Sequence, residues 1–369
     1  MAADRPLSVL ISGGGIAGAT LACLLAAGGH KVTVVERDQG VRSSGNPVDV
    51  RGPAFGVVER LGLVPRLRDL ATHVRELLLV DADGRRVASM ATRRSQDREL
   101  EVPRADLSAA LVDAARNKAE IRFDDMIVEL HPDDDGVDVT FERATPTRFD
   151  LVVGADGLHS AVRRMTFGLE SDFVKHLGMY VATVRLPIPP ERVDAVLMYN
   201  EPDAAVAVHP GTGTPIVAFM FRSPIKADPR DAVAGRRLMT AVYGDAGWRA
   251  KELLAAYLAA SDTYFDTVSQ VRLPAWSHGR VTLIGDAASC VSLFGEGSSS
   301  AILGAATLTE ALAMTPQNIP AALTRYEAKH RPASRRGQRA VPIVSHLLIP
   351  ASRAGITLRN QGLRLTGHR

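Results

Sequence analysis

The 369-residue chain contains only two cysteines, Cys23 and Cys290. They lack the spacing of a metal site and are too few for a disulfide framework, which excludes a small disulfide-stapled secreted protein. We therefore expect no metal site and a reducing compartment, the cytoplasm. Cys23 falls within a predicted helix, where it is most simply a small core residue.

Charge of one sign is also scarce. The formal net charge is +3, and no run of five or more like charges occurs. Nothing in this pattern indicates an arm that binds nucleic acid. No apolar stretch approaches the length of a membrane span, and the first apolar segment starts too near the N-terminus to leave room for a signal peptide. The expectation is a protein without a membrane span and without a nucleic-acid partner.

The sequence does contain a glycine fingerprint near its start. Residues 7–11 are apolar and rich in β-branched side chains, as a buried parallel strand is. Gly13, Gly15 and Gly18 follow in the spacing G-x-G-x-x-G, and residues 19–27 predict a helix. The first glycine permits a tight turn, the second lets the backbone approach a pyrophosphate, and the third lets the helix pack closely. A glycine-rich loop that binds nothing is the simpler alternative, but these flanking elements favour a dinucleotide at the helix N-terminus.

Glu36 narrows the choice of dinucleotide. It follows the next apolar strand, predicted at 31–35, where an acid can hydrogen-bond both hydroxyls of an adenosine ribose. The same carboxylate would repel a 2′-phosphate, which argues against NADP as the resident ligand. NAD and FAD both remain at this stage.

Two later segments show a buried strand that ends beside an acid. One strand, at 150–154, precedes Asp156, and the other, at 279–285, ends at Gly285 and Asp286. An acid at the carboxyl end of a parallel strand lies where ligands bind in such sheets. A carboxylate there can accept hydrogen bonds from a ribityl chain, which FAD has and NAD lacks.

The whole chain predicts an α/β protein with an inserted sheet. The expected discontinuous nucleotide domain consists of residues 1–72, 98–170 and 276–340, the sheet-rich domain of 73–97 and 171–275, and a helical tail of 341–369. The expected helices lie at 53–61, 103–117, 300–314 and 321–336, with antiparallel strand pairs at 76–80 with 86–90 and 121–130 with 136–142.

Together these segments resemble the class A flavoprotein monooxygenases, the para-hydroxybenzoate hydroxylase-like family, and within it the tetracycline-inactivating and antibiotic-tailoring enzymes. The resemblance runs from Ser8 to about Arg336. It implies a GR2-type, Rossmann-like FAD domain with an inserted substrate domain. Arg104 is similar to the arginine of the family's R-x-x-L-x-x-x-L motif. Arg42 and Asp49 resemble the pair that flanks the flavin in the tetracycline-modifying members.

The resemblance also implies residue roles. The first motif would bind the ADP half of FAD, Asp156 would lie near the pyrophosphate and serve NAD(P)H use, and Asp286 would hold the ribityl chain. A helix that begins near Gly297 and Ser298 is expected to stabilise negative charge on reduced flavin through backbone N–H groups. The full set expected to bind FAD is Gly13, Gly15, Ala17, Gly18, Glu36, Arg37, Arg42, Asp49, Arg104, Asp156, Gly285, Asp286, Gly297 and Ser298.

The implied activity is a monooxygenation. NADPH or NADH would reduce FAD, reduced flavin would react with O₂, and a C4a-hydroperoxyflavin would transfer one oxygen atom to an aromatic or polyketide-like small molecule. Because the cofactor carries this chemistry, no catalytic side chain is assigned. His209 has the chemistry of a base for a phenolic substrate, although a structural role is commoner for a lone histidine. Arg163 is a candidate for docking the nicotinamide cofactor or, equally, part of a solvated helix face.

The sequence departs from the family on the substrate side. Ser289 stands where the family often has histidine, and the loop after it lacks a common proline. Two other functions therefore stay open, a flavin dehydrogenase or oxidase that inserts no oxygen, and a flavoprotein scaffold with a non-redox role. Monomer and homodimer are both compatible with the sequence.

Overall fold

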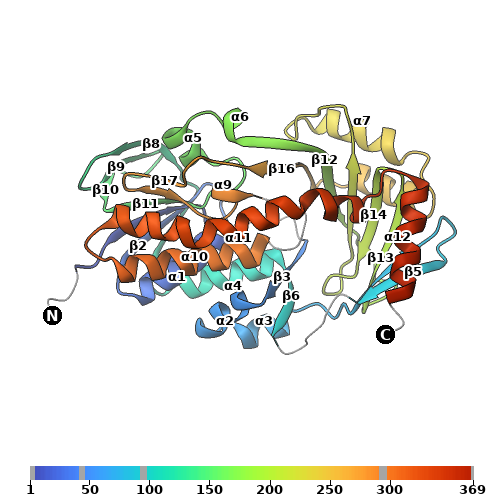
Figure 1. Cartoon of the computed structure of the whole chain (residues 1–369), viewed down its shortest axis with the longest axis horizontal. Helices are drawn as coiled ribbons and strands as arrows, with labels where there is room; N and C mark the ends of the chain where they lie inside the picture. Colours follow the sequence, from blue (N-terminus) through green and yellow to red (C-terminus); the bar gives the residue numbers. More distant parts are fainter. Residues whose placement is uncertain (1–4, 41–45, 92–97, 291–296, 367–369) are drawn as a thin grey trace.

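The computed structural model describes residues 5–40, 46–91, 98–290 and 297–366. Two lobes lie side by side along the long axis of the molecule, each built on its own sheet (Figure 1). One long helix near the C-terminus runs from the first lobe to the second. The predicted α/β fold is confirmed.

The first lobe is built on a six-stranded sheet in the order β17-β18-β11-β1-β2-β7. Five of its strands are parallel, and β17 runs antiparallel at one edge. Their apolar side chains are buried, as expected for a sheet covered on both faces. The strands are β1 (Ser8–Ser12), β2 (Lys31–Glu36), β7 (Glu120–Phe123), β11 (Leu151–Gly154), β17 (Ser277–His278) and β18 (Val281–Leu283).

Two different layers cover this sheet. On one face a group of helices packs together, with α1 against α4 and α10, and α10 against α11. A three-stranded antiparallel sheet, β10-β9-β8, contributes buried side chains from the other side. These elements are α1 (Ile16–Ala27), α4 (Arg104–Arg116), α10 (Gly297–Met314), α11 (Ile319–Leu348), β8 (Ile127–Pro132), β9 (Val137–Phe141) and β10 (Thr147–Phe149).

Short elements complete the first lobe. Strands β3 (Pro47–Arg51) and β6 (Glu99–Pro103) pair antiparallel beside helices α2 (Pro53–Arg60) and α3 (Val64–Asp69). Three further short helices are α5 (Ala161–Phe167), α6 (Glu170–Phe173) and α9 (Asp286–Ser289). Helix α9 follows β18 directly and therefore begins at the carboxyl edge of the parallel sheet.

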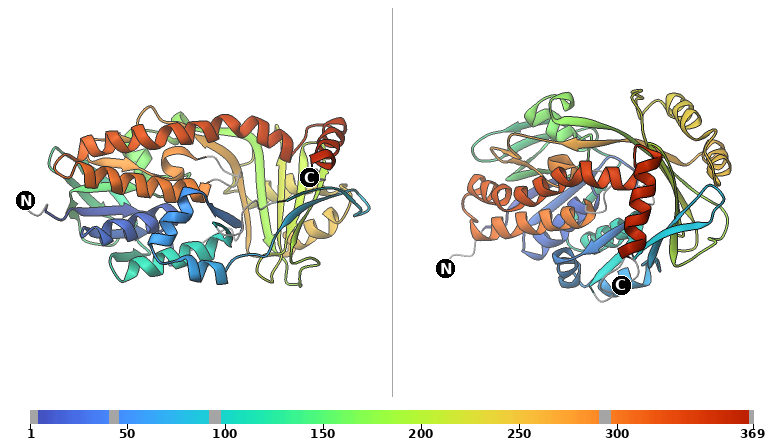
Figure 2. Two further views of the ribbon diagram at one scale, coloured as in Figure 1. Left: turned by 60° about the horizontal axis from the view of Figure 1, so that its bottom comes forward. Right: turned by 45° about the vertical axis from the view of Figure 1, so that its right-hand side comes forward.

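The second lobe is a seven-stranded sheet in the order β16-β12-β15-β14-β13-β4-β5. Helices α7 and α8 cover one face, where Tyr180, Phe219 and Phe221 pack against Tyr243 and Tyr257. The opposite face carries α12 and the last turns of α11 (Figure 2). The elements are β4 (Glu76–Val80), β5 (Arg86–Ala91), β12 (Val174–Arg185), β13 (Ala195–Glu201), β14 (Ala204–His209), β15 (Ile216–Arg222), β16 (Thr263–Val271), α7 (Ala232–Tyr243), α8 (Ala250–Ala259) and α12 (Arg353–Thr366).

The strand expected at 121–130 is in fact two strands with different partners. Asp124 has a positive φ of 60° and interrupts the extended chain after β7. The buried Asp125 carboxylate then accepts hydrogen bonds from Met126 N, directly after the turn, and from Arg143 N and Ala144 N, which follow β9. As a result β7 joins the parallel sheet beside β2, and only β8 pairs antiparallel with β9.

Helix α11 is longer than the range expected for it, 321–336. It continues through Pro332 and Pro342 to Leu348, so the segment expected as a separate tail from 341 begins inside a helix. Among the described residues no single helix is long and apolar enough to cross a membrane. Helices α11 and α12, which meet at 97°, meet that criterion only as a bent pair.

Candidate functional site

The three sequence motifs converge at the carboxyl edge of the six-stranded sheet. Strand β11 lies between β1 and β18, so the three strand ends are neighbours. The backbone continues this pairing beyond the strands, because Ala155 N donates to Ser12 O at 2.8 Å and Ile284 N donates to Gly154 O at 2.9 Å. Ligands of open α/β sheets bind at this edge.

The fingerprint glycines have the geometry that their spacing predicts. Gly13 has φ of +104°, and a Cβ there would lie 2.6 Å from Ala155 O. A Cβ on Gly18 would lie 1.9 Å from Gly13 O, so only glycine lets α1 pack against the loop. Gly15 caps the N-terminus of α1, and a Cβ there would meet nothing within 4 Å. The helix start therefore faces open space, as a pyrophosphate site requires.

Glu36 is fixed beside this helix start. Its Oε2 accepts a hydrogen bond from Gly14 N at 2.8 Å, and its Oε1 accepts one from Asp38 N at 3.1 Å. Each carboxylate oxygen keeps a further lone pair for a ribose hydroxyl. Arg37 follows with an exposed side chain.

Gly285 brings the third motif against the first. A Cβ on Gly285 would lie 2.9 Å from the Cβ of Ala17, so the start of α1 and the start of α9 pack in direct contact. Asp286 and the exposed Arg104 are both electrostatic neighbours of the buried Cys290 thiol, and burial raises the pKa of that thiol well above its ordinary value. Asp286 and Arg104, far apart in the sequence, thus both lie within electrostatic reach of the same thiol.

The first turn of α10 is tied to strand β3. The hydroxyls of Ser298 and Ser299 donate to Asp49 O at 2.6 and 2.9 Å, and Arg51 N donates to the Ser299 hydroxyl at 3.2 Å. The helix starts at Gly297, as the family resemblance implies, and three residues before the range 300–314 expected from the local pattern. Because the Ser298 hydroxyl is engaged within the protein, its backbone N–H is the group left for a ligand. Arg42 lies outside the described residues.

Asp156 has a different immediate role from the other motif acids. One carboxylate oxygen accepts from the Ser160 hydroxyl at 2.5 Å, and the other accepts from Ala161 N at 2.8 Å and Val162 N at 3.1 Å. It therefore caps the N-terminus of α5, and burial raises its pKa against these hydrogen bonds. Its part in NAD(P)H use stays a prediction.

Arg163 is neither a docking residue nor part of a solvated face, because its side chain is fully buried. Its guanidinium donates to Ala287 O at 3.1 Å and Leu158 O at 2.6 Å and pairs with Glu170 at 3.4 Å. The side chain therefore joins the loop after β11 to α9. Its effect on the site is to hold two of the three motifs together.

Strand β16 supplies a polar pair that sequence reasoning missed. Tyr264 and Asp266 are two residues apart on the strand and so point to the same face of the sheet, and the Tyr264 hydroxyl donates to Asp266 at 3.0 Å. The neighbouring Asp266 raises the pKa of Tyr264, and the positive charge of Arg104 lowers it, so both side chains are electrostatic neighbours of the phenol. A tyrosine and an acid at an i, i+2 spacing just upstream of the third motif were the available signal.

His209 is held by both of its ring nitrogens. Gly211 N donates to Nδ1 at 2.9 Å, which leaves Nε2 to donate to Glu101 at 3.3 Å. Glu101 belongs to β6 and also accepts from the Thr72 hydroxyl. The histidine therefore joins the two lobes, and the structural interpretation fits it better than a substrate base.

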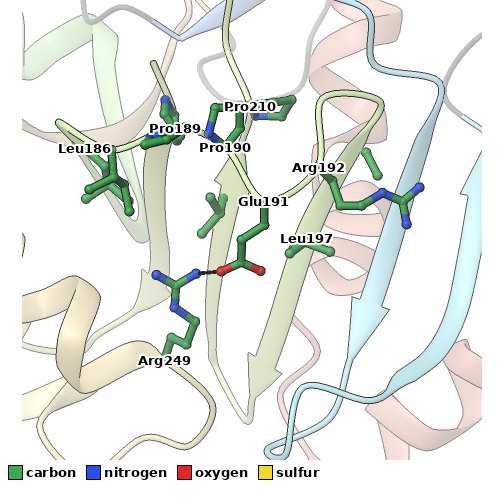
Figure 3. A pocket seen from close by; sticks show the side chains of 12 residues that line it. Leu186, Pro189, Pro190, Glu191, Arg192, Leu197, Pro210 and Arg249 are labelled. Atoms are coloured by element: carbon green, nitrogen blue, oxygen red, sulfur yellow. Dashed lines mark hydrogen bonds and ion pairs between the residues drawn. The ribbon is translucent and has the colours of Figure 1, made fainter. Parts of the chain in front are cut away.

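A separate, largely apolar pocket lies at the edge of the second lobe (Figure 3). Leu186 and Leu197, which line it, belong to the cluster packed against α7 and α8. Glu191 and Arg249 form an ion pair within it. The pocket therefore opens on the face of the sheet opposite to Tyr264 and Asp266 and does not join the motif site. Within the described part of the chain, no three His, Cys, Asp or Glu side chains are grouped as metal ligands.

Comparison with known proteins agrees with this geometry. The family model described as FAD binding domain matches residues 6–340. An uncharacterized protein of Mycobacterium tuberculosis (strain ATCC 25618 / H37Rv) is 37% identical over 332 residues, which cover 87% of this chain and 89% of that protein. A flavin-dependent monooxygenase of Legionella longbeachae is 29% identical over 332 residues, covering 88% of this chain and 85% of the relative.

A solved structure shows the same architecture. The crystal structure of tetracycline destructase Tet(55) superposes with a TM-score of 0.84 at 29% identity, over 97% of this chain and 95% of that chain. The family match covers both the motif segments and the inserted sheet. The chain therefore belongs to the FAD-binding family of class A flavin-dependent monooxygenases.

Proposed function

We propose that this protein uses NADPH or NADH and O₂ to oxygenate an aromatic or polyketide-like small molecule. The observation that carries the proposal is the meeting of three strand ends, the open start of α1, and the Asp286–Arg104 neighbourhood at one edge of the sheet. A flavin-dependent monooxygenase and a tetracycline destructase share its family and its fold.

The residues at this edge fit FAD. The space in front of Gly15 accepts the pyrophosphate, whose charge the N-terminus of α1 favours. Glu36 would accept hydrogen bonds from the adenosine ribose, and Asp286 would accept them from the ribityl hydroxyls. Arg104 and Asp49 would border the ring system, beside the first backbone N–H groups of α10. Bound FAD supplies the redox chemistry, and the protein orients it.

The overall reaction balances with one reductant and one oxygen molecule. With FAD bound, the nicotinamide and one proton would supply the reducing equivalents, one atom of O₂ would enter the substrate, and the other would leave as water. The oxygen-transfer route implied by the family resemblance belongs to this proposal. The chain's own part is to hold the ring system between α10 and the sheet and to limit the access of water.

Tyr264 and Asp266 are proposed to face the substrate from the sheet. The pair offers one phenol donor and one carboxylate acceptor, which suits a substrate that carries hydroxyl or keto groups. Hydroxylated aromatic and polyketide-like molecules have such groups. The relatives named above support this class without naming a single compound.

The test is a spectrum followed by an isotope experiment. Purified protein reconstituted with FAD is titrated anaerobically with NADPH and then NADH, and bleaching of the flavin bands reports reduction. Substrates from the aromatic and polyketide classes are then converted under ¹⁸O₂, and mass spectrometry measures the incorporation of ¹⁸O into the product. One ¹⁸O atom in the product is the expected result.

Two other outcomes would replace the proposal. Oxidised product without ¹⁸O would make the protein a dehydrogenase or oxidase. A bound flavin that neither nucleotide reduces, with or without substrate, would favour a flavoprotein that uses FAD structurally.

A further inference from the structure

A cavity of about 260 Å³ lies between α11, α9 and the segment that joins β16 to β17. These elements lie next to one another in the first lobe (Figure 1). Its walls include Trp276 and Ala288 and the hydroxyl residue Ser289, the last residue of α9. Since Asp286 begins the same helix, the cavity lies one helical turn from the proposed ribityl ligand.

Cationic side chains dominate the lining. Arg331, Arg335 and Arg339 are spaced four residues apart on α11 and so lie on one face of that helix, and Arg272 joins them from the segment after β16. No aspartate or glutamate is among the described lining residues. Like charges at this spacing repel one another, so the arrangement has a cost without an anion to offset it.

Only one of these arginines is neutralised within the protein. Arg331 pairs with Glu327 and donates to the carbonyl oxygens of Pro274 and Leu273. Among the described residues Arg272, Arg335 and Arg339 have no ion-pair partner. Three guanidinium groups are therefore available at the cavity.

Ser334 adds an uncharged donor between them. Its side chain lines the same cavity and is only 8% exposed, and no described protein group forms a hydrogen bond with its hydroxyl. A hydroxyl at this position supplies one uncharged donor for a polar ligand in the cavity.

The helix face that carries these groups is fixed to the rest of the lobe. The Gln338 side chain donates to Val271 O at 2.7 Å, and the Gln270 side chain donates to Gln338 O at 3.2 Å. These two buried hydrogen bonds fix which face of α11 points toward the cavity. The helix backbone that carries Arg335, Ser334 and Arg339 is thus positioned by contacts within the protein.

We infer that this cavity binds a phosphate group. Guanidinium groups present paired N–H donors that match phosphate oxygens, and a hydroxyl beside them completes the donor set. Given the proposed function, one source is the 2′-phosphate of NADPH, which would make NADPH the preferred reductant. The other source is a free phosphate or a small phosphorylated metabolite. The site is separate from Glu36, which would repel such a group.

The first experiment uses the FAD-loaded protein and no turnover. Binding of adenosine 2′-monophosphate, adenosine and inorganic phosphate is measured by calorimetry for the wild type, Arg335→Gln, Arg272→Gln and Arg336→Gln. Arg336 is the matched control, since it is exposed on the same helix but does not line the cavity. Loss of one lining arginine is expected to weaken binding of the phosphorylated ligands about tenfold, with no change for Arg336→Gln.

The second experiment separates the two sources. Anaerobic flavin reduction is followed by stopped flow with NADPH and with NADH. If NADPH is the source, Arg335→Gln and Arg272→Gln each raise the dissociation constant of NADPH about tenfold and leave that of NADH and the limiting rate unchanged. If free phosphate is the source, phosphate binding falls in the variants while both nucleotides reduce the flavin as before.

The inference is overturned if neither phosphorylated ligand binds the wild-type protein, or if both lining variants bind as tightly as Arg336→Gln. Arg272 lies on a different segment from Arg335, so a folding defect in one variant leaves the other informative. Failure here is distinguishable from failure of the proposed function, because reduction of the flavin by NADH does not require a phosphate site.

Discussion

At the scale of one residue, Glu36 is the proposed link between the first motif and the adenosine ribose of the cofactor. The carboxylate accepts from Gly14 N and Asp38 N and, in the proposed site, from the adenosine ribose. Glu36→Ala removes all of these bonds, and we expect the dissociation constant of FAD to rise about 10–100-fold. This dissociation constant is measured by titrating FAD into the apoprotein and monitoring flavin fluorescence. Glu129→Ala, on the exposed surface of β8, is the control, and equal affinity in the two variants would contradict the ribose assignment.

His330 makes stability depend on pH. It lies among Trp276, Tyr326 and the backbone of Gly304, only 8% exposed, and burial lowers its pKa from 6.5 to about 4. Between these two values the unfolded chain binds a proton that the folded chain does not, so stability falls as the pH falls. Above pH 6.5 the histidine makes no such contribution.

From about pH 8 to about pH 5 this histidine should remove about 2 kcal/mol from the free energy of unfolding. Urea unfolding at both pH values checks the figure. His330→Gln should lose that part of the pH dependence, whereas His131→Gln, exposed on β8, should keep it. The assignment fails if the two variants show the same difference between the two pH values.

At the scale of elements, the motif strands were predictable and the connecting strands were not. Strands β1, β2, β11 and β18 are short apolar runs that end in glycine or an acid, which is a strong local signal. Strands β3 and β6 have no such pattern, because their formation depends on pairing between segments about 50 residues apart. The helical length of α11 was hidden for a similar reason, since contacts made by Gln338 with β16 stabilise a segment that contains Pro332 and Pro342.

The residues of the candidate site also fall into two groups, those that a local sequence pattern predicts and those that it does not. The glycines, Glu36 and Asp286 carry their chemistry in a local pattern, and their roles could be predicted from it. Tyr264, Asp266 and the arginines of the phosphate cavity come from segments whose meeting only the folded chain reveals.

A substitution at Gly337 tests whether α11 is a regular helix at this position. It lies in the middle of the helix, and a Cβ there would meet nothing within 4 Å. Gly337→Ala should therefore raise the free energy of unfolding by about 0.5–1 kcal/mol through lower backbone entropy in the unfolded chain. Gly304→Ala on α10 is the contrast, because its Cβ would lie 3.2 Å from Nε2 of His330 and the same gain should be absent. Chemical denaturation measures both, and destabilisation by Gly337→Ala would mean that the helix bends at this residue.

At the scale of the whole molecule, the two lobes are joined by contacts of different kinds. His209 and Glu101 connect the sheet of the second lobe to β6, and Gln338 connects α11 to the end of β16. Helix α12 and the last turns of α11 lie on the second sheet, far along the molecule from the glycine fingerprint (Figure 2). We therefore expect that the last turns of α11 and helix α12 open locally without loss of the nucleotide site.

Asn200 is the side chain that holds this end of the molecule together. Its amide N donates to Leu348 O at 3.0 Å, and its amide O accepts from Arg359 at 2.9 Å, so one residue of β13 anchors both α11 and α12. Asn200→Ala would leave these groups without their partner at a cost of about 1–3 kcal/mol. Because α12 buries little apolar surface of its own, we expect that cost to appear as local opening rather than as global unfolding.

Hydrogen exchange measured by mass spectrometry should then show faster exchange in α12 of Asn200→Ala, by about tenfold or more, with unchanged exchange in β1 and α1. Asn318→Ala is the matched control, since Asn318 caps the opposite end of α11 by accepting from Ala321 N at 3.0 Å. It should speed exchange only in the first turn of α11. Uniformly faster exchange across the molecule in Asn200→Ala would instead mean that the C-terminal helices and the nucleotide lobe unfold as one cooperative unit, and that the FAD site depends on this distant anchor.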